Sequence, residues 1–205
     1  VHTRYSLDAS TQGTRTTPDQ AYRFARGEVV VSSTGVRARL QRPLDFLVTA
    51  DHAENLGLAP MIEERNPDLL KLEFGRRIAQ LVYDGKAGEA YTLWGEGMSA
   101  RQHPLAGQDD LTRSMWARLT AAAERFNEPG KFTTLIAYEW TSIPNGRNMH
   151  RNVFFRDKGP EAPFSAYDSI QPADLWTYQE KLRAKGIDSL AIPHNGNVSD
   201  GWMYS

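Results

Sequence analysis

The stretch LDFLVTADHAE, residues 44–54, decides the fold that the sequence predicts. It begins as a mostly apolar run and closes with the polar residues Asp51, His52 and Glu54. A short run of this kind is typical of a strand buried on both faces, as in a parallel sheet covered by helices. Polar groups at the carboxyl end of such a strand lie where α/β folds bind ligands. Asp51 and His52 are therefore predicted to reach a shared pocket, although this motif alone fits equally well with Asp51 capping a helix and His52 filling a loop.

The same pattern recurs in two later segments. FTTLIAYEWTS, residues 132–142, is an apolar run that leads to Glu139, and SLAIPHNGN, residues 189–197, leads to His194 and Asn195. Because the carboxyl ends of several strands can meet at one edge of a sheet, these side chains are expected to lie close to those of the first stretch.

The chain opens on VHTRYSLDA, where His2 and Asp8 look like the tip of a strand whose body is missing. A mixture of imidazole and carboxylate groups without thiolate suits zinc, manganese or iron. Without a shared metal site, four separate segments would have to carry histidine or carboxylate side chains by chance. Asp8 alone could equally cap a turn. The predicted metal ligands are His2, Asp8, His52, Glu139 and His194.

The composition excludes several classes of protein. The chain has 205 residues with 24 basic and 25 acidic side chains, and no basic face with interleaved aromatics is visible, so nucleic acid is not an expected partner. No apolar run approaches the roughly 18 residues that a membrane span needs, so the chain is expected to be soluble. The lack of cysteine excludes a disulfide framework, a thiolate nucleophile and a zinc finger. One domain, residues 1–205, is the default expectation for this length.

The ends of the sequence suggest a piece of a longer protein. Val1 lies inside a motif, and residues 201–205, GWMYS, end without a helix or a capping signal. We therefore expect a fragment from which any export signal has been removed. The sequence leaves open the compartment, whether periplasmic, exported or cytoplasmic, and the oligomeric state.

The segment after the opening motif contains a helix start and a hairpin. Thr17 is expected to cap a helix that begins at Pro18, with Gln20 completing a capping box. Residues 28–40 suggest a short hairpin.

A long, mainly helical insertion, about residues 55–130, is expected to wall the pocket. Within it, residues 69–82 and 109–126 have apolar side chains at helical spacing, which indicates packing rather than cofactor binding. A further helix is expected over residues 172–185, before the strand at 189–192. This alternation of helices and strands predicts an α/β chain with a largely parallel sheet.

Four motifs occur in this order along the chain: VHTRYSLDA, DFLVTADHAE, LIAYEW and IPHN. They resemble the motifs of the PHP (polymerase and histidinol phosphatase) superfamily. The segments TRTTPDQAYRFARGE, YEWTS, HRNVFFRD and IPHNGN are most similar to a bacterial branch of it that is known only as a domain of unknown function. The resemblance covers essentially the whole chain. It implies a distorted seven-stranded β/α barrel, here a partial barrel with a long helical insertion, and two or three metal ions at the carboxyl ends of its strands.

The resemblance assigns ligands position by position. His2 matches the second histidine of an opening His-x-His pair, and Asp8 matches a ligand position six residues later. His52 matches the ligand of the second motif, Glu139 resembles the bridging carboxylate, and His194 resembles the histidine of the next ligand strand. The first histidine of the pair, a later histidine and a closing Asp-x-His motif have no match, so the expected site is incomplete in this chain.

These ligands imply a metal-dependent hydrolase, with a small phosphorylated ester as the expected substrate. Two or three divalent cations (zinc, manganese or iron) would make a hydroxide from water near neutral pH and clamp phosphate oxygens. Glu139 has two oxygens and can bridge two cations, and Asp51 is expected to hold the imidazole of His52 from outside the ligand set. Two alternatives are hydrolysis of a carboxylic ester, amide or lactone, and a metal-binding scaffold without turnover.

Further residues are candidates for the reaction. His150 and Arg151 are predicted to act beside Glu139 in catalysis, and Arg4 and Asn195 to contact substrate, because guanidinium pairs bidentately with oxyanions. A structural salt bridge is an equal alternative for either arginine, and a structural hydrogen bond is an equal alternative for His150.

Overall fold

The computed structural model of the protein describes residues 1–99 and 102–204. The helices are α1 (Leu7–Thr11), α2 (Pro18–Ala25), α3 (Leu58–Glu63), α4 (Pro67–Lys71), α5 (Glu73–Tyr83), α6 (Ala87–Ser99), α7 (Asp109–Phe126) and α8 (Pro172–Ala184), with short 3-10 turns at Pro144–Gly146 and Trp202–Tyr204. The strands are β1 (Val30–Val31), β2 (Arg37–Ala38), β3 (Ile136–Trp140), β4 (Arg151–Phe155) and β5 (Ser189–Pro193).

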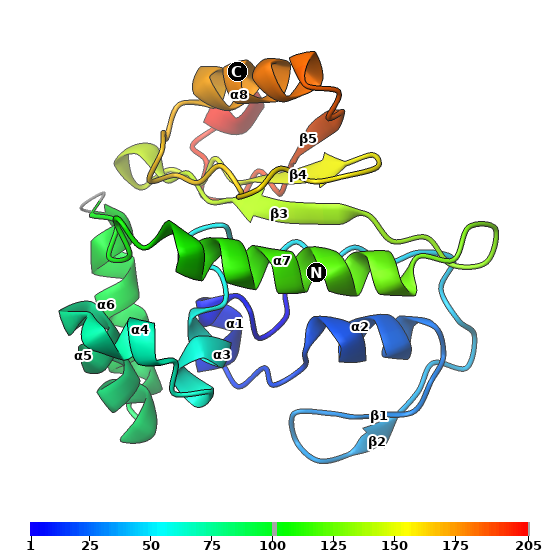
Figure 1. The fold of residues 1–205 in the computed structure, drawn as a ribbon, viewed down its shortest axis with the longest axis horizontal. Helices are drawn as coiled ribbons and strands as arrows, with labels where there is room; N and C mark the ends of the chain where they lie inside the picture. The colour runs from blue at the N-terminus through cyan, green and yellow to red at the C-terminus, as the bar shows by residue number, and fades with distance from the viewer. Residues whose placement is uncertain (100–101, 205) are drawn as a thin grey trace.

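The strands form antiparallel sheets, so the prediction of a largely parallel sheet and of a seven-stranded β/α barrel is wrong. Among the described residues, β1 pairs with β2, β4 lies between β3 and β5, and neither sheet closes. The short connection between β3 and β4 explains part of the difference, because a parallel pair needs a crossover of about a dozen residues or more. Helix α7 packs along β3, and α8 packs along β5 (Figure 1).

Residues 44–54 do not form a regular strand, and the stretch ends in a turn that begins at Glu54. They run parallel to the segment that leads into β3, with isolated bridges between Phe46 and Thr133 and between His52 and Glu139. Phe46 is 65% exposed, so the predicted burial on both faces is wrong for the first half of the stretch. The second half is buried, and it brings His52 beside Glu139.

Local sequence signals locate two of the helices correctly. The capping box at α2 is confirmed: Thr17 Oγ1 accepts a hydrogen bond from the Gln20 backbone N–H at 3.2 Å, and Gln20 Oε1 accepts one from the Thr17 N–H at 2.9 Å. Helix α7 spans the predicted residues 109–126, and its apolar stripe packs into the core. The buried residues of this stripe are Leu111, Met115, Trp116, Leu119, Ala122 and Ala123.

The three-stranded sheet has one face packed against helices. Tyr138 and Phe155 lie on this face, with ring centroids 5.8 and 6.3 Å from that of Trp116 in α7. Arg151 lies on the same face, 5.2 Å from the ring of Trp176 in α8. Because side chains alternate along a strand, the residues between these point to the opposite face, where Glu139 lies.

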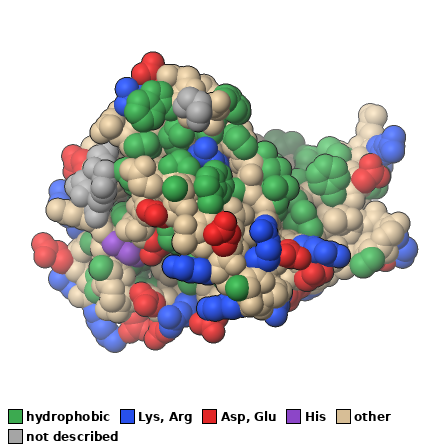
Figure 2. All heavy atoms as spheres, turned by 90° about the horizontal axis from the view of Figure 1, so that it is seen from above, with side chains coloured by type: hydrophobic (Ala, Val, Ile, Leu, Met, Phe, Trp, Pro, Cys, Tyr) green, Lys and Arg blue, Asp and Glu red, His purple; other side chains and the backbone are tan. Residues whose placement is uncertain are grey.

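The molecular surface mixes charged side chains with patches of apolar ones (Figure 2). Leu190 and Ile192 of β5 are 60% and 45% exposed. None of the described helices is both long and apolar enough to cross a membrane.

Candidate metal centre

One side of the candidate site is built on the antiparallel sheet. Glu139 of β3 lies opposite Asn152 of β4, which in turn lies opposite Ile192 of β5. His150 and His194 are each two residues from these partners, and the His194 N–H donates to the His150 carbonyl at 3.0 Å. The alternation of side chains therefore brings Glu139, His150 and His194 to the same face.

The other side comes from the opening segment, which is pinned by Asp51. The Asp51 carboxylate is fully buried and accepts hydrogen bonds from Thr3 N at 2.6 Å, Thr3 Oγ1 at 2.8 Å and Ser6 Oγ at 2.9 Å. Ser6 Oγ in turn accepts from the backbone N–H of His52 at 3.0 Å. Asp51 thus fixes the backbone around His2. The prediction that Asp51 holds the imidazole of His52 is wrong, because Nδ1 of that ring is hydrogen-bonded to the Thr141 hydroxyl and Nε2 faces Asp8.

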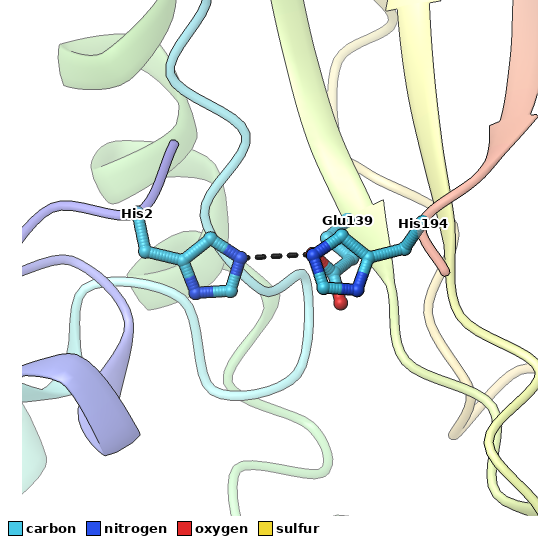
Figure 3. A group of neighbouring side chains, drawn as sticks. All are labelled: His2, Glu139 and His194. Atoms are coloured by element: carbon cyan, nitrogen blue, oxygen red, sulfur yellow. Dashed lines mark hydrogen bonds and ion pairs between the residues drawn. The ribbon is translucent and has the colours of Figure 1, made fainter. Parts of the chain in front are cut away.

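Glu139 is the centre of the cluster. Its side chain has no exposed surface, and four imidazoles surround it. His2 Nε2 lies 2.8 Å from Oε2, and His150 Nδ1 lies 2.8 Å from Oε1. His194 Nε2 is 3.6 Å from Oε2, and His52 Nδ1 is 3.7 Å from Oε1. His2 and His194 reach the carboxylate from segments at opposite ends of the chain (Figure 3).

Asp8, on α1, adds a second carboxylate to the cluster. Its Oδ2 lies 3.3 Å from His52 Nε2, and its Oδ1 lies 3.9 Å from His2 Nδ1. Donor atoms of His2, Glu139 and His194 lie within 4.8 Å of one another, as do donor atoms of His2, Asp8 and His52. The structure thus brings together the five residues predicted as ligands. Imidazole and carboxylate donors at these separations could hold zinc, manganese or iron.

The carboxylates and His2 shift one another's pKa values. Burial alone would lower the pKa of His2, but the nearby carboxylates of Asp8 and Glu139 outweigh burial and raise that pKa to about 10. Burial alone would raise the pKa values of Glu139 and Asp8, and the histidine partners instead lower both well below the usual range. Both carboxylates are therefore charged near neutral pH, and His2 carries a proton that a bound cation would replace.

A family model described as "Protein of unknown function (DUF3604)" matches residues 1–205, the whole chain. The chain belongs to this family. No curated protein and no solved structure matches it. The resemblance to the PHP superfamily therefore stays a prediction for this DUF3604 chain.

Two arginines predicted to take part are held away from the cluster of the DUF3604 chain. Arg4 forms an ion pair with Glu63 of α3. Arg151 is buried on the other face of the sheet, where Nη1 donates to the Met149 carbonyl at 2.7 Å. Neighbouring residues of a strand point to opposite faces, so Arg151 cannot share the orientation of His150.

Asn195, predicted to contact substrate, is hydrogen-bonded to His194, one of the predicted ligands. Its amide lies 3.0 Å from Nδ1 of His194, and its Oδ1 accepts from Asn148 Nδ2 at 3.2 Å. Such a contact fixes the ring orientation and leaves Nε2 of His194 toward Glu139.

Two functional contacts were not predicted from the sequence. Thr141 orients His52, and its position two residues after Glu139 on an extended segment is a signal that could have identified it. Trp94 of α6 lies with its ring centroid 6.0 Å from that of His52. Nothing in the local sequence of α6 distinguishes Trp94 from other core aromatics, because its approach to His52 depends on how the helices pack.

Proposed function

We propose that this protein is a metal-dependent hydrolase of small esters, with phosphate esters as the first candidate class. The observation that carries the proposal is the fully buried Glu139 carboxylate with four imidazoles around it. Burying ionised groups costs several kcal/mol for each ion in order of magnitude, so packing alone gives little reason for such a cluster. A dense mixture of imidazole and carboxylate without thiolate is instead the ligand chemistry of catalytic metal sites.

The donor set falls into two overlapping groups that fit divalent cations. His2 belongs to both groups. With Asp8 and His52 it would hold one cation, and with Glu139 and His194 it would hold another. Bound there, the cations would supply Lewis acidity, which activates water and withdraws charge from an ester oxygen.

The chain's own residues would orient the site and move protons. Thr141 and Asn195 hold the rings of His52 and His194 in place. When Nδ1 of His150 donates to Glu139, its Nε2 is left buried and without a hydrogen-bond partner among the described residues. That nitrogen is therefore free to accept a proton or to bind a cation.

A second candidate function is hydrolysis of an uncharged carboxylic ester, amide or lactone. In the described ranges, no arginine or lysine is hydrogen-bonded to or paired with Asp8 or Glu139, and Arg4 and Arg151 are engaged elsewhere. An anionic phosphate usually gains from guanidinium contacts, whereas an uncharged carbonyl does not need them.

The test compares metal-free and metal-loaded protein on both substrate classes. Protein stripped with a chelator is reloaded with Zn²⁺ or Mn²⁺ and assayed on p-nitrophenyl phosphate, bis(p-nitrophenyl) phosphate, p-nitrophenyl acetate and a simple lactone. We expect activity to disappear on chelation, to return with metal, and to fall at least about 100-fold in Glu139→Gln. The surface variant Glu161→Gln is the matched control and should keep full activity. Turnover that survives chelation or Glu139→Gln would refute the proposal, and bound metal without turnover would indicate a scaffold.

A further inference from the structure

The backbone of residues 44–50 has two edges, and one of them faces the segment that leads into β3. On this edge, the Asp45 carbonyl accepts from the Thr133 N–H at 2.9 Å, and the Leu47 N–H donates to the Thr133 carbonyl at 3.1 Å. These bonds join the stretch to the segment that leads into β3, in parallel orientation.

The opposite edge is paired at its two ends. At the first end, the Leu44 N–H donates to the Ala25 carbonyl at 2.8 Å, and at the second end the partner is Val1. The Val1 amino group donates to the Val48 carbonyl at 2.9 Å, and the Val1 carbonyl accepts from the Ala50 N–H at 2.9 Å. These are the bonds of a parallel ladder. In the part of the chain that the structure describes, the ladder stops there: the Val48 N–H, both backbone groups of Phe46 and the Leu44 carbonyl make no hydrogen bond.

Apolar cavities flank this open edge. A cavity of about 730 Å³ is lined by Val1, Leu44, Phe46, Val48 and Phe154, among others. A second cavity, of about 600 Å³, also includes Val1 and Leu44, together with the apolar residues Phe24, Ala25 and Leu47. Val1 and Phe46 are 62% and 65% exposed. Open backbone groups between two apolar hollows are the features of an edge that accepts a strand.

We propose that residues 44–48 bind an extended polypeptide strand that runs parallel to them, in line with Val1, with apolar side chains on both of its faces. The observed bonds of Val1 fix the register. Two residues earlier in such a strand, one residue would donate its N–H to the Phe46 carbonyl and accept from the Val48 N–H. Its neighbours, which point alternately to the two faces, would fill the two cavities. A small molecule would fill one hollow but would leave the ladder unpaired.

This inference does not depend on the proposed function, because none of the open groups belongs to the metal centre. The open edge and the metal centre are nevertheless adjacent in the chain. Val1 precedes His2, so a strand continuing its ladder would hold His2 more firmly toward Glu139.

The test supplies the strand by extending the full chain at its N-terminus. One version carries a short extension of valine and isoleucine, and another carries glycine and serine. Two further versions of the apolar extension each carry one proline. In one, proline replaces the penultimate residue, whose N–H should bond to the Phe46 carbonyl. In the other, proline replaces the last residue, whose N–H should point away from residues 44–48. Thermal unfolding and hydrogen exchange at the Val48 amide are measured for all of them.

We expect the apolar extension to raise the Tm by about 5 °C or more above the glycine-serine version. Exchange at the Val48 amide should slow at least about tenfold. Proline at the penultimate position should remove most of both effects, and proline at the last position should remove little. Phe46→Asp should reduce the gain, whereas the equally exposed control Val36→Asp should not.

Equal Tm values for the apolar and glycine-serine versions would overturn the proposal, as would insensitivity to the position of the proline. A dimer of the unextended chain in which the Val48 amide is already protected would also overturn it, because the occupant would then be a second copy.

Discussion

The carboxylate of Asp51 offers a sharp test of how the opening segment is held. Asp51 is fully buried, as are its partners Thr3 and Ser6. Asp51→Ala removes an acceptor of three hydrogen bonds, two of them from Thr3 and one from Ser6. A buried donor left without an acceptor costs about 1–3 kcal/mol. The hydroxyls can turn toward other acceptors and the Thr3 amide cannot, so we expect a total loss of about 3–5 kcal/mol.

The size of this loss separates it from ordinary surface effects. A chain of this length loses about 2–4 °C in Tm for each kcal/mol, so Asp51→Ala should unfold roughly 10 °C below the wild type. Asp51→Asn keeps one carbonyl oxygen and should lose only about 1–2 kcal/mol. Metal-free protein is unfolded in urea and by heat, so that loss of bound cations does not add to the result.

Asp45→Ala is the matched control, because Asp45 lies in the same stretch and its exposed side chain makes no hydrogen bond or ion pair with any residue that the structure describes. We expect Asp45→Ala to stay within about 0.5 kcal/mol of the wild type. A stability of Asp51→Ala equal to that of Asp45→Ala would refute the view that Asp51 pins the opening segment.

The remaining predictions concern the cluster. Thr141→Val should weaken zinc binding about 10–100-fold, because it frees the ring of His52. A metal-binding titration in which Thr141→Val binds zinc as tightly as the exposed control Thr177→Val would contradict this. Cobalt(II) should quench the fluorescence of Trp94, whose ring centroid is 6.0 Å from that of His52; Trp94→Phe should remove most of the quenching, and unchanged quenching in that variant would count against a cation at His52. The stability of the metal-free protein should fall with alkaline pH: because the pKa of His2 is raised from 6.5 to about 10, its stabilising contribution is complete below 6.5 and is lost as pH rises through about 10. Urea unfolding measured from pH 6.5 to pH 10 checks this. The prediction is wrong if the unfolding free energy of the wild type falls with pH no more steeply than that of His2→Gln.

Local signals in the sequence predicted local structure well. The capping box at Thr17 depends only on neighbouring residues, and the stripe of α7 depends only on helical periodicity, so both could be predicted without tertiary information. The five predicted ligands also lie together, because polar residues that follow buried segments tend to meet at one site.

The direction of the strands could not be predicted from the same patterns, since an apolar run looks alike in parallel and antiparallel sheets. The short connection from Glu139 to His150 was nevertheless a usable signal, because it leaves little room for a parallel crossover. The prediction that Arg151 acts beside Glu139 was wrong for a second reason. Arg151 follows His150 directly in an extended segment, so the two side chains could not both have faced Glu139.

The contact between His2 and Glu139 joins residues that are 137 positions apart in the chain. A ribosome makes His2 before β3 and β5, so His2 waits for Glu139 and His194 while the intervening residues are made. A cation captured early would meet only His2, Asp8 and His52, and it would gain Glu139 and His194 when the sheet closes over it. The cations available when β3 and β5 fold, rather than those available when His2 is made, would then decide which metal the folded site carries.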